Sequence, residues 1–494
     1  MVTDANKMDS ELIQESTAVN GASDMRDVPL CVDLDGTLLR TDLFYESLLA
    51  LLARKPFVLF LLPVWLLRGK AALKREIASR VNLDVTTLPY NNQLIAELMA
   101  SSHRKRVLCT ASDSSLADKV AAHLGLFDLV LASDGERNLS GPRKAATLVE
   151  HFGERGFDYA GNATIDLHVW RHARRAWVIN ASDSLAAAAA RECPVETHSA
   201  PSNGGLKSWL RAIRLHQWLK NLLVLVPLLA SHRFLDASAV ALTLAAFLAF
   251  SLCASGVYVL NDLLDLAADR LHPRKRARPF AAGDIPLPAG MFAAPMLTAA
   301  GIAIALLVGP LFALVLLVYF ATTLAYSLRL KRVAMLDVVV LAGLYTIRII
   351  GGAVAIHSVL SFWLLAFSMF TFLSLAMVKR YTELGVLLAN SRSEASGRGY
   401  NVEDLPLIQS LGAASGYIAV LVLALYINSP ESLALYHRPQ VLWLLCPLIL
   451  YWMSRFWVIA HRGEMNDDPV VFAALDRISQ AVLLLCGLIA MVAI

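Results

Sequence analysis

The sequence predicts a soluble α/β domain followed by an all-α polytopic membrane domain of about nine transmembrane helices. The chain has 494 residues, which is more than one hydrophobic core usually organises. Hydrophobic residues make up 57% of it and the mean hydropathy is +0.55, so most of the chain should lie in lipid. Near residue 205, alternating apolar and charged segments give way to long apolar runs.

The first part of the chain reads as a soluble domain with a polar leader. Residues 1–27 are polar and lack an apolar core segment, so we expect a disordered N-terminus and no signal peptide. An α/β domain should follow over 28–182, and a linker over 183–206 that ends in SNGG. Its strands are expected in five apolar runs: PLCVDLDG, RVLCTAS, DLVLAS, FDYAG and AWVIN.

Charge and cysteine content exclude some function classes. The six cysteines are scattered and form no CxxC pair, so we expect reduced thiols rather than disulfides or a zinc site. The net charge of +4 is modest, and no nucleic-acid partner is expected.

The apolar run FVLFLLPVWLL (57–67) is too short to span a bilayer and contains a proline. It is either an interfacial helix that rests the soluble domain on the membrane or a buried helix.

The membrane domain is expected over 207–494. Its apolar segments are 217–231, 238–260, 289–308, 310–328, 336–356, 361–378, 411–428, 440–460 and 477–494. The loops at 270–279, 329–332 and 379–383 are strongly basic, whereas the opposite loops carry little charge. The positive-inside rule places the basic loops, and with them the N-terminal domain, in the cytoplasm of a bacterial-type inner membrane.

A candidate metal site lies where the second apolar segment ends, in NDLLDLAADR (261–270). Asp262, Asp265 and Asp269 have the spacing of one helix face, and like charges there repel unless a cation lies among them. Carboxylate oxygens suit Mg²⁺, which bridges to phosphates. The basic residues that follow would bind diphosphate oxygens; they are Arg274, Lys275, Arg276 and Arg278. A helix cap with a topological basic loop would explain the basic run but not the three acids.

The motif NDxxDxxxD, followed by a basic loop, resembles the UbiA-type intramembrane prenyltransferases. The resemblance covers 207–494 and implies that Asn261, Asp262, Asp265 and Asp269 bind Mg²⁺ and a diphosphate. Members usually carry a second acidic cluster, DxxxD. Here Asp337 is followed four residues later by Leu341, so one carboxylate stands where two are expected.

A subgroup of that family looks more similar. RLHQWLKN, NDLLDLAADRLHPRKRARPFAAG, AYSLRLKR and MVKRYTEL resemble polyprenyl-phosphate phosphoribosyltransferases. This implies Mg²⁺-dependent transfer of 5-phosphoribose from phosphoribosyl diphosphate (PRPP) to a polyprenyl phosphate, with Asp337 orienting the ribose hydroxyls or a second metal. Five cations at predicted helix ends would bind the two phosphate-bearing substrates, although membrane topology or snorkelling explains each equally well. They are Arg214, Lys220, Lys331, Lys379 and Arg380. For Arg348, inside a span, we favour a role in the site over a polar contact between helices.

The run CVDLDGTLLRTD (31–42) resembles the haloacid dehalogenase (HAD) phosphohydrolases, which have a Rossmannoid fold, here with a helical cap over about 40–101. The resemblance implies that Asp33 attacks phosphorus and binds Mg²⁺ and that Asp35 protonates the leaving group. It also gives Thr110 and Lys144 as phosphate-binding residues, and Asn162 and Asp166, in GNATID, as metal ligands. Because an amide stands at 162, the domain is either a slow phosphatase or a phosphate-binding module.

Together these readings describe an enzyme of cell-envelope biosynthesis that makes a polyprenyl-phosphate sugar and then removes its 5-phosphate. Two alternatives stay open. One is a prenyltransferase that moves a polyprenyl chain from its diphosphate to an aromatic acceptor. The other is a transporter or receptor with a phosphate-sensing module, which should show inverted repeats.

Overall fold

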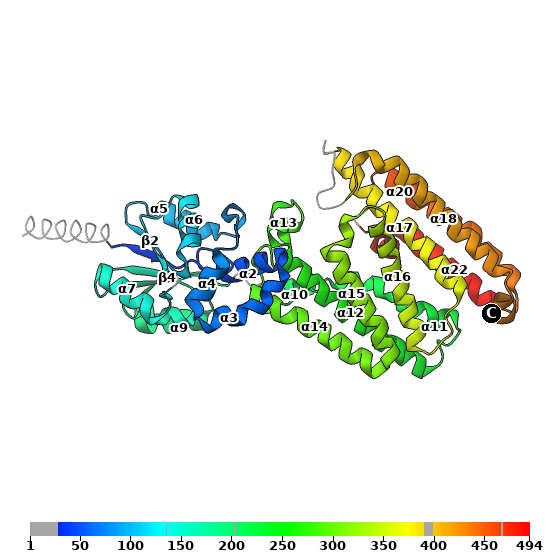
Figure 1. Ribbon diagram of the computed structural model, residues 1–494, viewed down its shortest axis with the longest axis horizontal. Helices are drawn as coiled ribbons and strands as arrows, with labels where there is room; N and C mark the ends of the chain where they lie inside the picture. The colour runs from blue at the N-terminus through cyan, green and yellow to red at the C-terminus, as the bar shows by residue number, and fades with distance from the viewer. Residues whose placement is uncertain (1–27, 135, 202–203, 390–398, 466–467) are drawn as a thin grey trace, which may run out of the picture. The chain divides into compact units, whose positions relative to one another are not determined.

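The computed structural model describes residues 28–134, 136–201, 204–389, 399–465 and 468–494 (Figure 1). The predicted disordered stretch 1–27 lies outside these residues. The chain divides into two compact units, and each is described by itself. The first unit contains Met1–Ala212 and Leu260–Phe292, and the second contains Ile213–Val259 and Ala293–Ile494.

The first unit is built on a six-stranded sheet in which every paired strand is parallel. Its order is β3-β2-β1-β4-β5-β6. From β1, the strands β2 and β3 are added toward one edge of the sheet, and β4, β5 and β6 are added toward the other edge. The strands are β1 (Leu30–Val32), β2 (Arg106–Asp113), β3 (Leu129–Ser133), β4 (Asp158–Gly161), β5 (Arg175–Val178) and β6 (Val195–His198). In open sheets of this kind, ligands bind beyond the carboxyl ends of the strands at the point where the order reverses.

Helices cover both faces of the sheet, as the alternation of buried side chains in its strands requires. Leu30 and Val32 of β1 pack with α5 (Asn92–Ala100) and α6 (Ser114–Leu124). Cys31, between them, points to the opposite face and joins the cluster formed with α7 (Pro142–Phe152), α8 (Leu167–Trp170) and α9 (Asp183–Glu192). The strand runs are therefore apolar on both sides because both sides are buried.

The α/β domain extends further than the sequence suggested. Residues in the predicted linker form α9 and β6, and β6 pairs with β5. The alanine-rich run before Cys193 is thus a helix packed on the sheet through Ala189. The predicted linker is confined to the residues after β6, before α10 (Gly205–Ala212).

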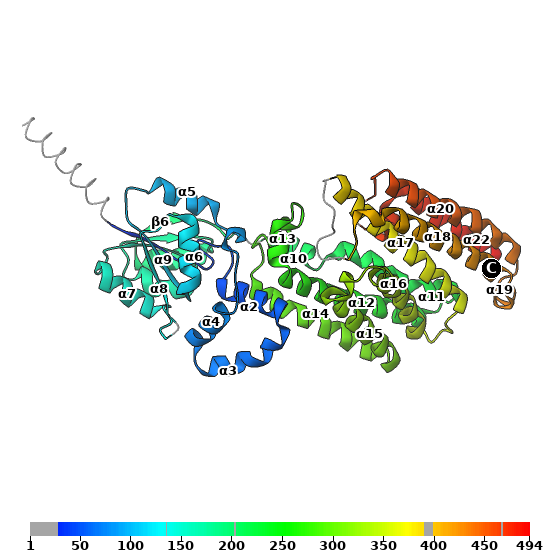
Figure 2. The ribbon, with the colours of Figure 1, turned by 45° about the horizontal axis from the view of Figure 1, so that its top comes forward.

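A lobe of short helices is inserted after β1 (Figure 2). Its elements are α2 (Leu43–Arg54), the 3₁₀ helix η1 (Pro56–Leu61), α3 (Leu62–Leu67), α4 (Lys70–Ala78) and η2 (Val85–Thr87). Asp42 caps α2 by accepting from the Phe44 amide. Leu51, Trp65 and Ile77 form a small core of its own. This lobe lies in the range predicted for the cap, 40–101, and we call it the cap; α5, in the same range, packs against the sheet instead.

The helical part carries seven helices long and apolar enough to span a membrane among the described residues, or eight if one bent pair counts as a span. The sequence predicted nine. The first, 217–231, is instead the 3₁₀ helix η4 (Leu215–Leu225) followed by the short α11 (Val226–Ala230). The last belongs to the bent pair, α21 (Pro469–Leu475) and α22 (Arg477–Ala493), which meet at 76°. The chain is a multi-pass integral membrane protein with an additional N-terminal α/β domain.

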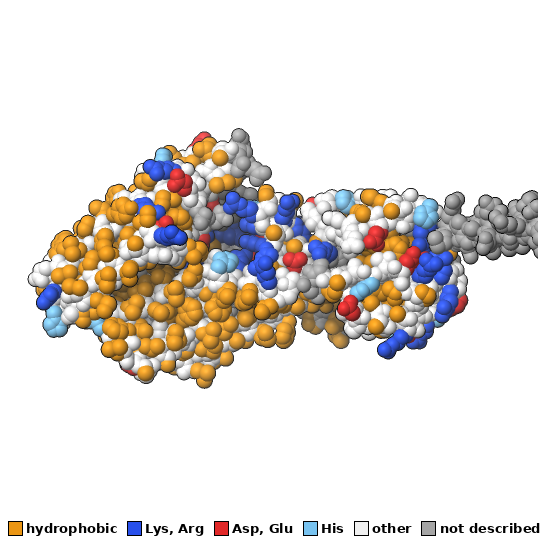
Figure 3. Space-filling view, turned by 180° about the vertical axis from the view of Figure 1, so that it is seen from behind, with side chains coloured by type: hydrophobic (Ala, Val, Ile, Leu, Met, Phe, Trp, Pro, Cys, Tyr) orange, Lys and Arg blue, Asp and Glu red, His pale blue; other side chains and the backbone are white. Residues whose placement is uncertain are grey.

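Apolar side chains form a broad outer surface on the helical part, which suits contact with lipid tails (Figure 3). The seven spans are Ala237–Leu264 (α12), Leu287–Val308 (α14), Pro310–Leu328 (α15), Leu336–Ala355 (α16), Phe362–Ala389 (α17), Val402–Ile427 (η7 and α18) and Pro439–His461 (η8 and α20). The shorter elements are α13 (Leu266–Leu271), η5 (Lys275–Ala277), η6 (Leu330–Arg332) and α19 (Pro430–Leu435).

Candidate active sites

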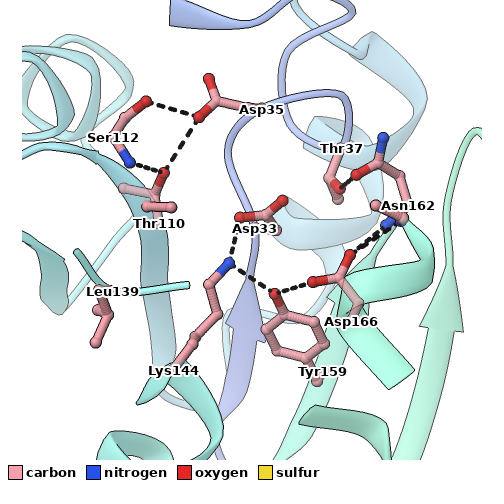
Figure 4. Close-up of polar contacts among 12 residues, drawn as sticks. Asp33, Asp35, Thr37, Thr110, Ser112, Leu139, Lys144, Tyr159, Asn162 and Asp166 are labelled. Carbon is pink, nitrogen blue, oxygen red and sulfur yellow. Dashed lines mark hydrogen bonds and ion pairs between the residues drawn. The ribbon is translucent and has the colours of Figure 1, made fainter. Parts of the chain in front are cut away.

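The first candidate site lies beyond the carboxyl ends of β1, β2 and β4, where the strand order reverses (Figure 4). Asp33 follows β1 directly and is buried. The Lys144 ammonium, from α7, donates to Asp33 Oδ1 at 2.7 Å and to the Tyr159 hydroxyl at 3.0 Å. Tyr159 donates in turn to Asp166 Oδ1 at 3.0 Å. The structure thus joins residues that are far apart in the sequence through one series of hydrogen bonds.

Asp35 is held by hydroxyl groups of β2 and by the backbone of the cap. Ser112 Oγ donates to Asp35 Oδ2 at 2.6 Å, and Thr110 Oγ1 lies 3.5 Å from the same oxygen. The amide of Leu43, at the start of α2, donates to Oδ1 at 2.8 Å. The carboxyl group is therefore oriented from both sides, and the cap helix begins against it.

Asn162 and Asp166 close the site on the β4 side. Thr37 Oγ1 donates to Asn162 Oδ1 at 3.2 Å. Asp166 Oδ2 accepts from the backbone amides of Asn162 and Ala163, both at 3.0 Å. Gly36, with φ of +79°, packs against the Asn162 amide so closely that a Cβ would lie 2.1 Å from its nitrogen. This contact explains the glycine of the DxDGT motif in physical terms.

The donor set at this site is made of hard oxygen ligands. Asp33, Asp166 and the Asn162 amide suit Mg²⁺ chemically, but with one negative charge fewer than three carboxylates would give. Among the described residues, no three His, Cys, Asp or Glu side chains are grouped as a metal site. A bound Mg²⁺ would thus depend on Asn162 as well as on the two acids.

Burial shifts the protonation of the two aspartates of the motif. It raises the pKa of Asp33 to about 7, although the Lys144 ammonium acts in the opposite direction. Burial raises the pKa of Asp35 to about 6, and the Asp42 carboxylate adds to that effect. Two carboxyl groups that titrate near neutral pH at a strand end are typical of acid–base chemistry. Asp35 is thereby able to hold a proton close to neutral pH.

Sequence reasoning missed three residues of this site, namely Lys74, Ser112 and Tyr159. Lys74, from α4 of the cap, donates to the Ala111 carbonyl at 2.6 Å, and burial lowers its pKa. Nothing in the local sequence of KAALKREIA distinguishes this lysine from a solvent-facing one. Ser112 ends a predicted strand, and this position was the available signal, whereas Tyr159 lies inside a predicted strand and gave none.

The second candidate site is the aspartate motif, which lies across the junction of two helices. α12 ends at Leu264, Asp265 is a turn residue, and Asp269 belongs to α13. The backbone still follows the helical path. The Asp265 amide donates to the Asn261 backbone carbonyl at 2.9 Å, and the Asp269 amide donates to the Asp265 backbone carbonyl at 2.8 Å. Asp262 and Asp269 are buried, whereas Asn261 and Asp265 are half-buried.

A guanidinium group lies between the two buried carboxylates. Arg278 Nη1 donates to Asp262 Oδ1 at 3.1 Å and to Asp269 Oδ2 at 2.6 Å. Two carboxylates that converge on one cation provide the charge and oxygen ligands that Mg²⁺ requires, so the residues fit that metal. Arg274, Lys275 and Arg276 are exposed beside them. Arg278 is thus a predicted basic residue that the structure places on the acids.

In the second unit, two predicted cations share a carboxylate that the sequence analysis overlooked. Lys220, on η4, forms an ion pair with Asp468, and Lys379 Nζ lies 3.6 Å from Asp468 Oδ2. The lysines lower the pKa of Asp468 to about 2, against the effect of its burial. Asp468 precedes α21, and an acidic pair ahead of a proline in MNDDP was the signal available.

Asp337, the remaining acid of the second cluster, is fully buried in contacts with protein groups. Arg380 forms an ion pair with Asp337 Oδ2, and the Tyr400 hydroxyl donates to Oδ1. Arg380 also contacts Glu383 and the Tyr326 hydroxyl. The structure therefore places both predicted residues in one buried cluster, in which the Arg380 guanidinium binds the carboxylates of Asp337 and Glu383.

Arg348 is buried in α16, and its role in the site stays a prediction. Its guanidinium donates to Asn221 Oδ1 at 2.7 Å, to the Tyr319 hydroxyl at 2.9 Å and to the Leu344 carbonyl. These contacts join α16 to η4 and α15, as expected of a polar contact between helices. Arg214 stacks on the Tyr258 ring at 4.8 Å, and Lys331 is half-buried in η6.

Comparison with known proteins supplies relatives for this arrangement. The model of the UbiA prenyltransferase family matches residues 222–479. The uncharacterized protein y4nM of Sinorhizobium fredii is 40% identical over 460 residues, or 92% of this chain and 89% of the relative. Nodulation protein NoeC of Azorhizobium caulinodans is 37% identical over 54% of this chain and 87% of the relative.

A decaprenyl-phosphate phosphoribosyltransferase of Mycolicibacterium smegmatis is 31% identical over 290 residues, or 58% of this chain and 91% of the relative. Among solved structures, a UbiA homolog from Archaeoglobus fulgidus bound to GPP and Mg²⁺ is similar, with 16% identity and a TM-score of 0.44. That match covers 57% of this chain and 99% of the other.

Proposed function

Because the chain belongs to the UbiA prenyltransferase family, we propose that it is a Mg²⁺-dependent membrane transferase that moves 5-phosphoribose from PRPP to a polyprenyl phosphate. The relatives named decaprenyl-phosphate phosphoribosyltransferases support this substrate pair. Family membership also disfavours the transporter or receptor alternative.

The observation that carries the proposal is the pairing of Asp337 with Arg380. A second acidic cluster would repel an acceptor that is itself a phosphate. Here that cluster is reduced to one carboxylate, Asp337, and the buried Arg380 guanidinium binds it together with the Glu383 carboxylate. An acidic cluster with one carboxylate fewer and a guanidinium bound to it repels an anionic lipid acceptor less, whereas a neutral aromatic acceptor would gain nothing from this change.

The proposed division of work follows from the charges. Asp262, Asp265 and Asp269 would hold Mg²⁺, which when bound offsets the charge of a diphosphate leaving group. Arg278 would move from the carboxylates to the diphosphate oxygens, for which its planar fork is suited. Lys220 and Lys379 would attract phosphate oxygens to the second unit. The acceptor phosphate is already ionised, so the transfer needs no general base.

We also propose that the N-terminal domain is a phosphatase acting on the 5-phosphate of the lipid-linked product. The matching family model begins at residue 222, so this assignment depends on the domain's own geometry. Asp33 would attack phosphorus while Lys144 offsets the phosphoryl charge, and Asp35 would deliver a proton to the leaving oxygen. A tether to the transferase would raise the local concentration of its substrate.

One assay tests both proposals. Membranes containing the protein would receive Mg²⁺, ribose-labelled PRPP and decaprenyl phosphate, and label in the organic phase would be counted. Labelled lipid without a 5-phosphate is expected from the wild type and labelled lipid that keeps it from Asp33→Asn. Label that stays in water, with turnover of a prenyl diphosphate and an aromatic acid instead, would refute the transferase proposal. Identical phosphorylated lipid from both proteins would refute the phosphatase proposal.

A further inference from the structure

The cap of the N-terminal domain carries an apolar surface that its own fold leaves uncovered. In η1 and α3, the side chains of Val58 and Trp65 point inward and are 8% and 6% exposed. Their neighbours point outward with exposed fractions between 47% and 89%; they are Phe57, Leu59, Phe60, Leu61, Val64, Leu66 and Leu67. We call this set the cap apolar surface. A soluble domain rarely exposes so dense a group of large apolar residues without a binding role.

Basic residues border this surface, and acidic ones are excluded from it. Between Glu46 and Glu76 the sequence has no acidic residue but contains Arg54, Lys55, Arg68, Lys70, Lys74 and Arg75. Arg54 and Lys55 precede the apolar stretch, Arg68 and Lys70 follow it, and all four are exposed. Apolar side chains flanked by cations are typical of segments that lie in the headgroup layer of an anionic membrane.

The cap apolar surface is connected to the phosphate site through α4. This helix begins at Lys70, beside the apolar surface, and carries Lys74, whose ammonium reaches β2 at the Ala111 carbonyl. A small cavity lies there, lined by Phe44, Ser47 and Lys74 of the cap and by Ser112 of β2. The buried hydroxyl of Ser47 has no hydrogen-bond partner in it. Ser112 is also the residue that donates to Asp35.

We propose that the cap apolar surface enters the interface of an anionic bilayer and thereby directs the N-terminal site to phosphate esters carried by membrane lipids. The chain is itself a membrane protein, so a bilayer is always within reach of the domain. Phe and Leu side chains would lie at the acyl boundary while the flanking Arg and Lys contact headgroup phosphates. The part concerning the substrate rests on the proposed phosphatase function; the part concerning the membrane does not.

The membrane contact is tested with the full chain in nanodiscs. Phe60→Cys, in a background of Cys446→Ser and Cys486→Ser, would carry an environment-sensitive fluorophore, and lipids with shallow nitroxide groups would act as quenchers. Met99→Cys is the matched control, because Met99 is 56% exposed in the same unit but on α5. We expect several-fold stronger quenching at 60 than at 99, and weaker quenching at 60 when anionic lipid is omitted. Equal quenching at both positions, or cross-linking of two copies through the thiol introduced at position 60, would overturn the proposal.

The substrate part is tested with the triple variant Phe57→Gln, Phe60→Gln and Leu67→Gln. We expect its kcat/KM for a polyprenyl-linked 5-phosphoribose in nanodiscs to fall at least five-fold, while hydrolysis of soluble p-nitrophenyl phosphate stays unchanged. Equal loss on both substrates, or on neither, would overturn the lipid-substrate assignment. If the wild type hydrolyses neither substrate, the phosphatase proposal and this assignment both fail, and the quenching experiment still decides the membrane contact.

Discussion

Arg270 and Glu46 form a two-pronged buried ion pair, with Arg270 Nη2 2.6 Å from Glu46 Oε1 and Nη1 3.1 Å from Oε2. Arg270 directly follows Asp269 in α13, and Glu46 lies in α2, the first helix of the cap. Their side chains are 7% and 3% exposed, and Thr41 donates to the same carboxylate at 2.7 Å. Within the first unit, this pair therefore fastens the segment that carries the aspartate motif to the cap.

Breaking this pair should destabilise the first unit. We expect Glu46→Gln to lower the free energy of unfolding by about 3 kcal/mol, because it leaves the Arg270 charge buried without a partner. Thermal unfolding of the purified full chain would measure the change. The matched control is Glu76→Gln, which removes a more exposed pair with Arg80 and should cost less than about 1 kcal/mol. Equal effects from the two substitutions would contradict the structural role.

Asp262→Asn and Asp269→Asn should each reduce phosphoribosyl transfer at least a hundredfold, a loss of about 3 kcal/mol of transition-state stabilisation. The reason is that each substitution removes a charged oxygen ligand from a site that already lies next to Arg278. Transfer of labelled ribose to lipid would be measured across a Mg²⁺ titration. Chelation by EDTA should abolish wild-type transfer, and retained activity in either variant or in EDTA would contradict the metal assignment.

Asp337→Asn should act differently from Asp262→Asn, because Asp337 is paired with Arg380 and Tyr400. We expect a loss of about 3 kcal/mol in stability and little change in the Mg²⁺ concentration needed for half-maximal transfer. Thermal unfolding and the Mg²⁺ titration, run on the same preparations, separate the two quantities. A large rise in the Mg²⁺ requirement with unchanged stability would show instead that Asp337 is a metal ligand.

How much of this was visible in the sequence depends on how local each signal is. DxDGT, Lys144 and GNATID were assigned to one site through their resemblance to the HAD phosphohydrolases, and in the structure the carboxyl ends of β1 and β4 meet at the edge of the sheet where Lys144 of α7 reaches Asp33. The break between α12 and α13 at Asp265 could not be predicted, because it is a small departure from a helix. The helical backbone hydrogen bonds continue on both sides of Asp265. The partners of Arg348, Lys220 and Asp337 lie more than 40 residues away or in another helix, and periodicity does not specify such pairs.

Asn162→Asp should raise the Mg²⁺-dependent phosphatase rate of the N-terminal domain. A carboxylate there would add the missing negative charge while keeping the Thr37 hydroxyl as a donor to its oxygen. We expect an increase of about tenfold at saturating Mg²⁺, equal to about 1.4 kcal/mol. Hydrolysis of p-nitrophenyl phosphate by the full chain would measure it, with Asp33→Asn in the same background as the inactive control. An unchanged rate would show that Asn162 does not limit metal binding.

The Lys220–Asp468–Lys379 cluster should make the second unit sensitive to acid. The two lysines hold the pKa of Asp468 at about 2, below the ordinary value of about 3.9. A carboxyl group whose pKa is depressed in the folded state stabilises that state above its ordinary pKa, and this contribution is lost as the pH falls toward the folded value.

We therefore expect Asp468→Asn to cost about 2 kcal/mol at pH 7, with the difference from wild type shrinking between pH 4 and pH 2. Thermal unfolding across this range is the measurement, and Glu464→Gln, at an exposed acid nearby, should show no such pH dependence. A difference that stays constant down to pH 2 would mean that Asp468 stabilises the fold through packing rather than through its charge.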